Sequence, residues 1–215
     1  MSRIKIVTGH FGSGKTEIAI NLATEHENSI IVDLDTVNPY YRTAEHREKL
    51  QKMGVEVIAS EFAATNVDIP TLPAEIIKVF TSEKPSVIDV GGDDDGAFAL
   101  GRYKNFFDEN DYEMYFVICG TRPLTKTADE VIELMGNIEG ASRLKITHLI
   151  NNTHLAHFTD EETVLKGQAL AEEVSQRTGI PIIFTTVPES LKEKLKDKIA
   201  NPVKGLKLYI NMERK

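Results

Sequence analysis

The chain has 215 residues, of which 41% are hydrophobic and 27% are charged, so it can bury the core of one α/β domain and is short for two. Its net charge of −8, without a stripe of lysine and arginine, argues against a nucleic-acid partner. No apolar run approaches the ~20 residues that span a bilayer, and the first residues enter a strand pattern rather than a signal peptide. We therefore expect one cytoplasmic domain over residues 1–215.

Short apolar runs rich in β-branched residues alternate along the chain with amphipathic segments. This alternation is typical of an α/β protein whose mainly parallel sheet is covered by helices on both faces. We expect about seven strands, at residues 4–9, 29–35, 55–60, 85–92, 114–120, 147–152 and 181–187. The expected helices lie at 17–26, 74–83, 126–140 and 164–179. Residues 206–212 fit either an edge strand or a closing helical turn.

The first expected strand leads into a glycine-rich turn and a helix, with the sequence VTGHFGSGKTE at residues 7–17. In this context G-x-x-x-x-G-K-T is a phosphate-binding loop. Its glycines let backbone N–H groups approach phosphate oxygens, and the helix that follows adds the positive end of its dipole. Lys15 can reach the β- and γ-phosphates, and the Thr16 hydroxyl can bind Mg²⁺. The predicted nucleotide-binding residues here are Gly9, His10, Phe11, Gly12, Ser13, Gly14, Lys15, Thr16 and Glu17.

Acidic residues follow two other expected strands. Asp33 and Asp35 are two apart and so share one face of the strand, and Asp35 falls at its end, where a carboxylate can orient water. The apolar run that ends in Asp89 has the form of a Walker B strand, whose aspartate binds Mg²⁺ through water. Gly91 and Gly92 then allow the backbone close to a γ-phosphate.

Two further segments beside these strands have open roles. Residues 38–42, NPYYR, are either a mobile lid or partner surface, or simply packed tyrosines. Asp93, Asp94 and Asp95 are interpreted as a solvated turn, with Asp93 the best candidate for a metal ligand among them. Cys119 lies in an apolar run and is predicted to be a buried structural thiol.

With these segments placed, the chain resembles the MinD/ParA/CobQ-type P-loop NTPases, the branch that includes the nitrogenase iron protein and the arsenite-pump ATPase. The resemblance rests on GHFGSGKTEIAINLA, VDLD and DVGG, and on the later loops NNTH and TTVPE. It implies a three-layer P-loop NTPase fold with ATP and Mg²⁺ as ligands. Lys15 and Asp35 are then catalytic, with Asp35 positioning water, and the metal residues are Thr16, Asp35 and Asp89.

The same resemblance places the base of the nucleotide. Asn151 matches the asparagine that hydrogen-bonds adenine, and Asn152 stands where relatives often have arginine or lysine. Val187 and Pro188 match the loop that packs on the base. Guanine-specific relatives have N-K-x-D here, and the stretch from Asn151 to His154 has no aspartate, so ATP is favoured over GTP.

Two residues depart from the pattern of this branch. The branch has K-G-G-x-G-K-T, and its first lysine reaches the partner's phosphates in an ATP-sandwich dimer; here His10 and Phe11 replace that lysine and the next glycine. A homodimer stays open, but its ATP-sandwich form is not expected. We expect the missing positive charge to come from Arg42 or Arg122, because both follow strand ends.

Several functions remain compatible with these motifs. The first is a slow ATPase that acts as a switch for a partner protein. The second is a ligase or kinase of the CobQ/CobB/dethiobiotin-synthetase kind, in which NPYYR, DDDG and TRPLTK line a pocket for a small-molecule acceptor. A metal-centre maturation NTPase is less favoured because the six histidines are scattered, the nearest pair being His154 and His157. The last is a non-catalytic nucleotide-binding module. Pro202 and Gly205 interrupt the basic carboxyl-terminal stretch, so no membrane anchor is predicted.

Overall fold

The computed structural model describes residues 2–35, 47–59, 74–92, 94–108, 110–153 and 159–209. Within these ranges the chain forms an eight-stranded parallel sheet in the order β3-β2-β4-β1-β5-β6-β7-β8. The strands are β1 (Ile4–Gly9), β2 (Ile30–Leu34), β3 (Glu56–Ala59), β4 (Ser86–Val90), β5 (Tyr112–Ile118), β6 (His148–Asn151), β7 (Ile182–Val187) and β8 (Val203–Gly205).

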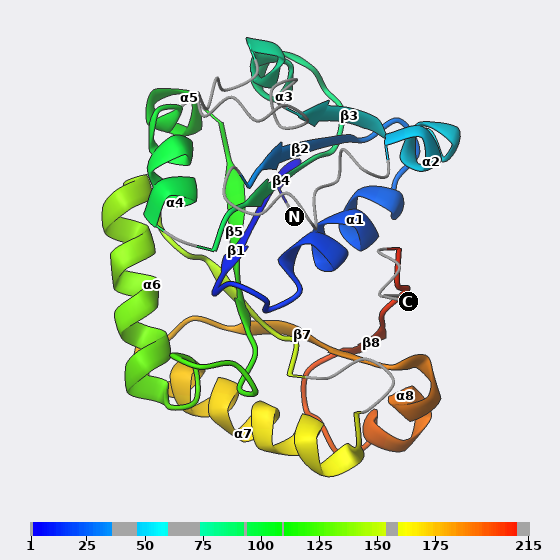
Figure 1. Cartoon of the computed structure of the whole chain (residues 1–215), viewed down its shortest axis with the longest axis vertical. Helices are drawn as coiled ribbons and strands as arrows, with labels where there is room; N and C mark the ends of the chain where they lie inside the picture. Colours follow the sequence, from blue (N-terminus) through cyan, green and yellow to red (C-terminus); the bar gives the residue numbers. More distant parts are fainter. Residues whose placement is uncertain are drawn as a thin grey trace.

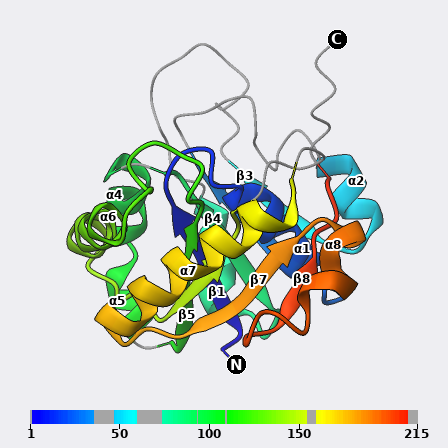
Figure 2. The same ribbon diagram turned by 90° about the horizontal axis from the view of Figure 1, so that it is seen from below.

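Helices cover both faces of this sheet. They are α1 (Lys15–Thr24), α2 (Arg47–Lys52), the single 3-10 turn η4 (Ala74–Ile76), α3 (Ile77–Thr81), α4 (Asp94–Gly101), α5 (Lys104–Asp108), α6 (Ala128–Ser142), α7 (Glu161–Thr178) and α8 (Glu189–Leu195). In Figures 1 and 2, α4 and α6 lie on one side of the sheet and α1 and α2 on the other. This is the three-layer α/β architecture that the alternating pattern predicts.

Two hydrophobic clusters fill the spaces between the layers. Alternate residues of each strand point to opposite faces, so Ile4 and Ile6 of β1 pack toward α4 and α6, whereas Val7 packs toward α1. A third, smaller cluster joins α7, α8 and the end of β7. Strands β1, β2 and β4 are buried along their whole length, as expected for central strands of a covered parallel sheet.

Local sequence signals set the ends of the long helices. Thr127 and Glu130 form a capping box at the start of α6, where each side chain accepts a hydrogen bond from the other's backbone N–H. The Asp160 side chain accepts a hydrogen bond from the Thr163 N–H at the start of α7, and Gly179 ends that helix with a positive φ of 73°.

The seven expected strands are confirmed, and the structure adds an eighth. β8 precedes the segment 206–212 that was expected to be a strand or a helical turn, and residues 206–209 are neither. Helices α2, α4, α5 and α8 were not predicted. Asp94 and Asp95, interpreted as part of a solvated turn, instead begin α4. Asp93 lies outside the described residues.

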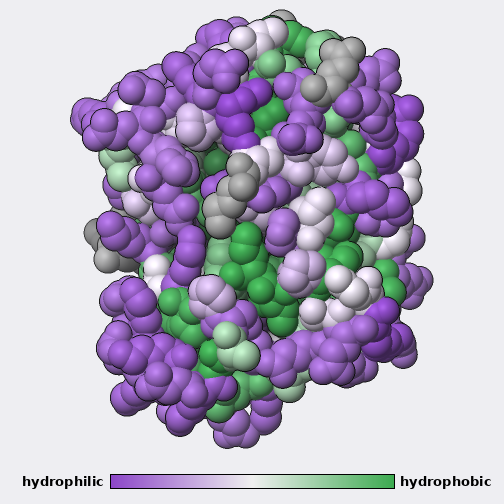
Figure 3. All heavy atoms as spheres, turned by 180° about the vertical axis from the view of Figure 1, so that it is seen from behind, coloured by the Kyte–Doolittle hydropathy of each residue, from purple (hydrophilic) through white to green (hydrophobic). Residues whose placement is uncertain are grey.

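Figure 3 shows hydrophilic side chains over most of the face seen from behind, with the largest hydrophobic area in its lower half. In the part of the chain that the structure describes, no helix is both long and apolar enough to cross a membrane.

Candidate functional site

The phosphate loop lies between β1 and α1, at the carboxyl edge of the central strands (Figure 1). Gly14 precedes α1 with a φ of 85°, and a Cβ atom there would lie 2.3 Å from the Asn152 amide nitrogen. Only glycine fits both this backbone conformation and this close contact. The Lys15 ammonium group donates a hydrogen bond to the His10 carbonyl at 3.2 Å, so it lies across the loop. The loop therefore has the geometry of an anion cradle at a helix N-terminus.

His10 and Arg122 are the groups that border the loop where the lysine of the resembled branch would stand. Burial lowers the pKa of His10, and the nearby Lys15 and Arg122 lower it further. His10 is thus neutral at pH 7 and supplies no fixed charge. Arg122 follows β5, and its Nε donates a hydrogen bond to the Gly12 carbonyl at 2.8 Å. The structure places one of the two candidate arginines against the phosphate loop; the other, Arg42, lies outside the described residues.

Asp89 at the end of β4 is the most buried charged group of the site, with 1% of its surface exposed. It pairs in register with Val7 of β1 and with Asp33 of β2. Burial is the main cause that raises its pKa to about 8; the charge of Asp33 raises it further, and Lys15 and the Thr16 hydroxyl lower it. Two neighbouring carboxyl groups cannot both ionise cheaply in a buried place, so Asp89 is held largely protonated near neutral pH.

The Asp89 carboxyl group fits a bound cation. Neither of its oxygens meets hydrogen-bond geometry with a described residue, although the Thr16 hydroxyl lies close enough to lower its pKa. Buried polar atoms are normally satisfied, so this group lacks a partner that a ligand could supply. Carboxylate and hydroxyl oxygens suit Mg²⁺, which usually keeps several waters and phosphate ligands. Within the described ranges no three His, Cys, Asp or Glu side chains form a metal site by themselves.

Asp35 lies just beyond the end of β2 and close to the same group. Its backbone N–H donates a hydrogen bond to Asp33 Oδ1 at 3.1 Å, and its charge contributes to the raised pKa of Asp89. The structure thus brings Lys15, Thr16, Asp35 and Asp89 together, as the sequence pattern predicts. The catalytic and metal roles of these residues stay predictions.

The loop after β4 packs onto the phosphate loop. A Cβ atom on Gly92 would lie 2.5 Å from the Phe11 backbone nitrogen and 2.8 Å from the Lys15 ammonium nitrogen. This contact requires glycine and joins the loop after β4 to the phosphate loop directly. The Phe11 side chain itself is 56% exposed, so it borders the site without filling it.

Asn151 and Asn152 have different surroundings. Asn152 is buried, and its amide donates a hydrogen bond to the Ser13 carbonyl of the phosphate loop at 2.5 Å, while its oxygen accepts one from the Thr186 hydroxyl. Asn151 is fully buried; its amide donates to Gln168 of α7, and its oxygen accepts from the Thr153 N–H. Asn152 is therefore the asparagine that joins the loop after β6 to the phosphate loop. Hydrogen bonding of Asn151 to adenine remains a prediction.

Val187 and Pro188 lie where β7 ends and α8 begins. The Val187 side chain is buried in the cluster with Val164 and Leu195, and Pro188 stands at the N-cap of α8. Their contact with a base remains a prediction. Gln168 accepts a hydrogen bond from Asn151, and Thr186 donates one to Asn152. The sequence did not predict either residue. The one local signal for Gln168 was its place on the otherwise apolar face of α7.

The Glu17 side chain bonds the C-terminal part of the described chain. It is buried one position after Thr16, and both of its carboxylate oxygens accept a hydrogen bond from the Tyr209 N–H, at 2.9 and 3.1 Å. His154 and His157 lie outside the described residues, as does the NPYYR segment.

The chain was compared with known proteins. No protein-family profile matches it, and no curated protein matches its sequence. It is similar in structure to the signal recognition particle receptor FtsY of Elizabethkingia anophelis in complex with GDP, with a TM-score of 0.51 and 17% identity over 88% of this chain and 58% of that one. A second structure of that receptor gives a TM-score of 0.52 at 17% identity, over 86% of this chain and 58% of that one.

Chloroplast FtsY from Physcomitrella patens gives a TM-score of 0.55 at 16% identity, over 88% of this chain and 59% of that one. The chain thus spans less than three fifths of the length of these receptors. At such identities the likeness bears on the fold. Together with the parallel sheet and the loop between β1 and α1, it shows that the chain has the α/β fold of the P-loop NTPases.

Proposed function

We propose that the chain is a Mg²⁺-dependent ATP-binding protein that hydrolyses ATP slowly and acts as a nucleotide switch for a partner protein. One observation carries the proposal: the buried Asp89 carboxyl group, whose oxygens lack hydrogen-bond partners among described residues, faces Thr16 and Lys15 of the phosphate loop. Mg²⁺ bound there would neutralise charge on the β- and γ-phosphates. Lys15 binds the same phosphates, and Asp35 orients the attacking water.

The proposal places the chain near the MinD/ParA/CobQ branch. Its support is the sequence resemblance in GHFGSGKTEIAINLA, VDLD and DVGG. The likeness to FtsY supports the P-loop fold and leaves the branch open.

Adenine is the base that we propose, although one of the similar FtsY structures is in complex with GDP. The stretch from Asn151 to His154 has no aspartate, so no carboxylate is available there for the N1–H and amino group of guanine. GTP bound here would lack a hydrogen bond to such a carboxylate. A difference of about 1.4 kcal/mol in binding free energy corresponds to about a tenfold preference for ATP.

Competition binding tests this proposal. Unlabelled ATP and GTP, each with Mg²⁺, are titrated against a fluorescent ATP analogue bound to the protein. We expect ATP to compete about tenfold more tightly than GTP. Equal competition, or a preference for GTP, contradicts the choice of adenine. If neither nucleotide binds, the proposed function itself is wrong.

The positive charge that stabilises the transition state is proposed to come from Arg122. Its Nε donates a hydrogen bond to the Gly12 carbonyl, and the other N–H groups of its planar guanidinium group could donate to a phosphate. His10 cannot serve this purpose, because its lowered pKa leaves it neutral.

A second function keeps one structural observation in its favour. Arg122 belongs to the TRPLTK segment, and it borders the phosphate loop, where an acceptor of the γ-phosphate would have to enter. This is the position expected in a ligase or kinase that activates a small-molecule acid. Steady hydrolysis of ATP without any acceptor, accelerated by a protein partner, supports the switch. Turnover that begins only when a carboxylic acid is added supports the ligase or kinase.

A further inference from the structure

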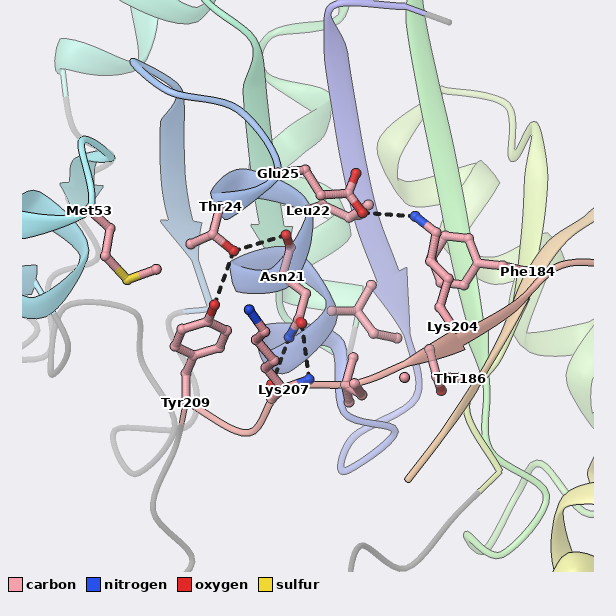
Figure 4. A pocket seen from close by; sticks show the side chains of 13 residues that line it. Asn21, Leu22, Thr24, Glu25, Met53, Phe184, Thr186, Lys204, Lys207 and Tyr209 are labelled. Atoms are coloured by element: carbon pink, nitrogen blue, oxygen red, sulfur yellow. Dashed lines mark hydrogen bonds and ion pairs between the residues drawn. The ribbon is translucent and has the colours of Figure 1, made fainter. Parts of the chain in front are cut away.

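Residues 206–209, here called the C-terminal strap, run along α1 directly after β8. The Tyr209 N–H is bonded to both carboxylate oxygens of Glu17. One turn further along α1, the Asn21 side chain donates to the Lys207 carbonyl at 2.8 Å and accepts from the Lys207 N–H at 3.2 Å. Figure 4 shows Asn21 of α1 beside Lys207 of the strap, with their two hydrogen bonds drawn as dashed lines. The strap is thus paired with the helix that begins with Lys15 and Thr16.

Tyr209 links this helix to a second element. Its hydroxyl lies 3.3 Å from that of Thr24 in α1, and its ring lies under the Lys49 ammonium group of α2, 5.2 Å from the ring centroid. Tyr209 is 8% exposed, although the two strap residues before it are exposed. Because α2 comes after residues 36–46, which follow Asp35, Tyr209 contacts both the phosphate-loop helix and the element beyond the predicted catalytic aspartate.

A groove lies between the strap and the body of the protein. It has a volume of about 330 Å³ and lies between α1, β7 and the strap, with Ile18, Leu22 and Phe184 in its lining (Figure 4). Only the two ends of the strap pack against the hydrophobic cluster of α1: Leu206 lies against it and Tyr209 belongs to it, whereas residues 207 and 208 between them are exposed. The strap is therefore held by its hydrogen bonds to α1 and by these two apolar contacts, a set that can open without unfolding the sheet.

We propose that the C-terminal strap is coupled to the nucleotide site through α1, so that Mg·ATP and the strap strengthen each other's binding. The proposal rests on the proposed function, because it takes ATP as the ligand. Glu17 is then a positioning residue: its carboxylate holds the strap, and its backbone belongs to the first turn of α1, beside Thr16.

The sign of the coupling follows from conformational order. Phosphate bound at Lys15 and Thr16 immobilises the first turn of α1, which carries Glu17. A helix end that is already ordered loses less entropy when the strap binds, so the two events cooperate. Thermodynamic linkage then requires that the strap raise nucleotide affinity by the same factor by which nucleotide stabilises the strap, typically about 5- to 150-fold.

Hydrogen exchange on the unmodified protein measures one side of this linkage. The amides of Lys207 and Tyr209 are followed by mass spectrometry, with and without a saturating β,γ-imido analogue of ATP and Mg²⁺. We expect both amides to exchange about tenfold more slowly with the nucleotide. Unchanged exchange in a protein that demonstrably binds the nucleotide overturns the strap proposal alone. Absence of nucleotide binding overturns the proposed function, and the strap proposal with it.

Two variants measure the effect of the strap on nucleotide affinity. Asn21→Ala removes both bonds to Lys207, and Tyr209→Pro removes the N–H that Glu17 accepts. Each is expected to raise the Kd for Mg·ATP by up to the factor seen in exchange. Asn110→Ala is the matched control, because Asn110 also bonds a backbone carbonyl, that of Phe106, but lies away from α1. If Tyr209→Pro fails to fold, Asn21→Ala decides: a wild-type Kd together with fast exchange at Lys207 refutes the coupling.

Discussion

At the scale of single residues, Asp89 shows how burial prepares a group for a ligand. A carboxyl group with 1% exposure and a neighbouring aspartate holds its proton up to a pKa of about 8. A cation bound to this carboxyl group would offset both burial and the charge of Asp33, because its positive charge favours the ionised carboxylate. Binding of Mg²⁺ at this group must therefore release a proton below pH 8, and the apparent Mg²⁺ affinity should fall as the pH is lowered.

Asp89→Asn is expected to stabilise the free protein. The carboxyl pKa is about 8 in the folded protein and 3.8 for an ordinary aspartate, so the folded state holds the proton that the unfolded state has lost. The wild type therefore loses stability as pH rises from about 4 through 8. The amide has no such loss, and we expect a gain on the order of 2–5 kcal/mol at pH 8.

Thermal unfolding of both proteins between about pH 3.5 and 8.5 measures this difference. The two curves should converge at the acid end, and Mg²⁺ with ATP should raise the Tm of the wild type only. A wild-type Tm that rises with pH over this range would mean that Asp89 is already ionised and compensated.

Arg122→Ala is expected to lower kcat for ATP by about 10²–10³, the usual effect of losing one donor that stabilises transition-state charge. The Kd for Mg·ATP should change little, because the hydrogen bond of Arg122 to the phosphate loop goes to the Gly12 carbonyl and occupies none of the N–H groups with which the loop would bind phosphate. Steady-state hydrolysis and equilibrium binding separate the two quantities. Arg42→Ala is the companion variant; unchanged hydrolysis in both would refute an arginine source of the charge.

At the scale of elements, the site is made of loops that touch one another before any ligand is added. The loop after β4 meets the phosphate loop at Gly92, and the loop after β6 meets it at Asn152. Parallel strands end at one edge of the sheet, which is why loops distant in sequence can form these contacts. A change in one loop is thus transmitted to the phosphate loop by direct contact.

Gly92→Ala tests this contact between loops. Its Cβ would lie 2.5 Å from the Phe11 nitrogen, so the loops must separate, and we expect at least a tenfold loss of nucleotide affinity. Gly136→Ala is the control, because a Cβ at that position of α6 has no atom within 4 Å. Alanine there should stabilise the helix by about 0.5–1 kcal/mol. Equal nucleotide affinity in the two variants, measured by fluorescence titration, would contradict the proposed contact.

At the scale of the whole molecule, the charge pattern bears on self-association. Large hydrophobic side chains near the phosphate loop, Phe11 and Leu124, are 56% and 65% exposed, so this end offers apolar surface to a partner. The net charge of −8 opposes the approach of a second copy, and neutral His10 supplies no cation for that copy's phosphates.

We expect Mg·ATP to leave the oligomeric state unchanged. Sedimentation velocity with and without the nucleotide should give the same species, whether that species is a monomer or a homodimer. His10→Lys restores the charge of the resembled branch and serves as the comparison. A dimer that forms only with ATP in the wild type would contradict the role assigned to His10.

How much could be predicted from the sequence differs between local and distant features. The strand, loop and helix around Lys15, the seven main strands, and the positions of Asp35 and Asp89 at strand ends follow from patterns within about ten residues. The short elements α2, α4, α5 and α8 were missed, since a helix of little more than two turns depends more on packing than on its own sequence.

The sequence by itself determined the phosphate loop, the acidic strand ends and the α/β class, because glycine positions and hydrophobic periodicity act on the local backbone. Only the tertiary structure decided that Arg122 reaches Gly12, that Asn152 reaches Ser13 and that the Tyr209 N–H reaches Glu17. These pairs are separated by 110, 139 and 192 residues. No local pattern encodes such contacts, because they depend on the order in which the strands join the sheet.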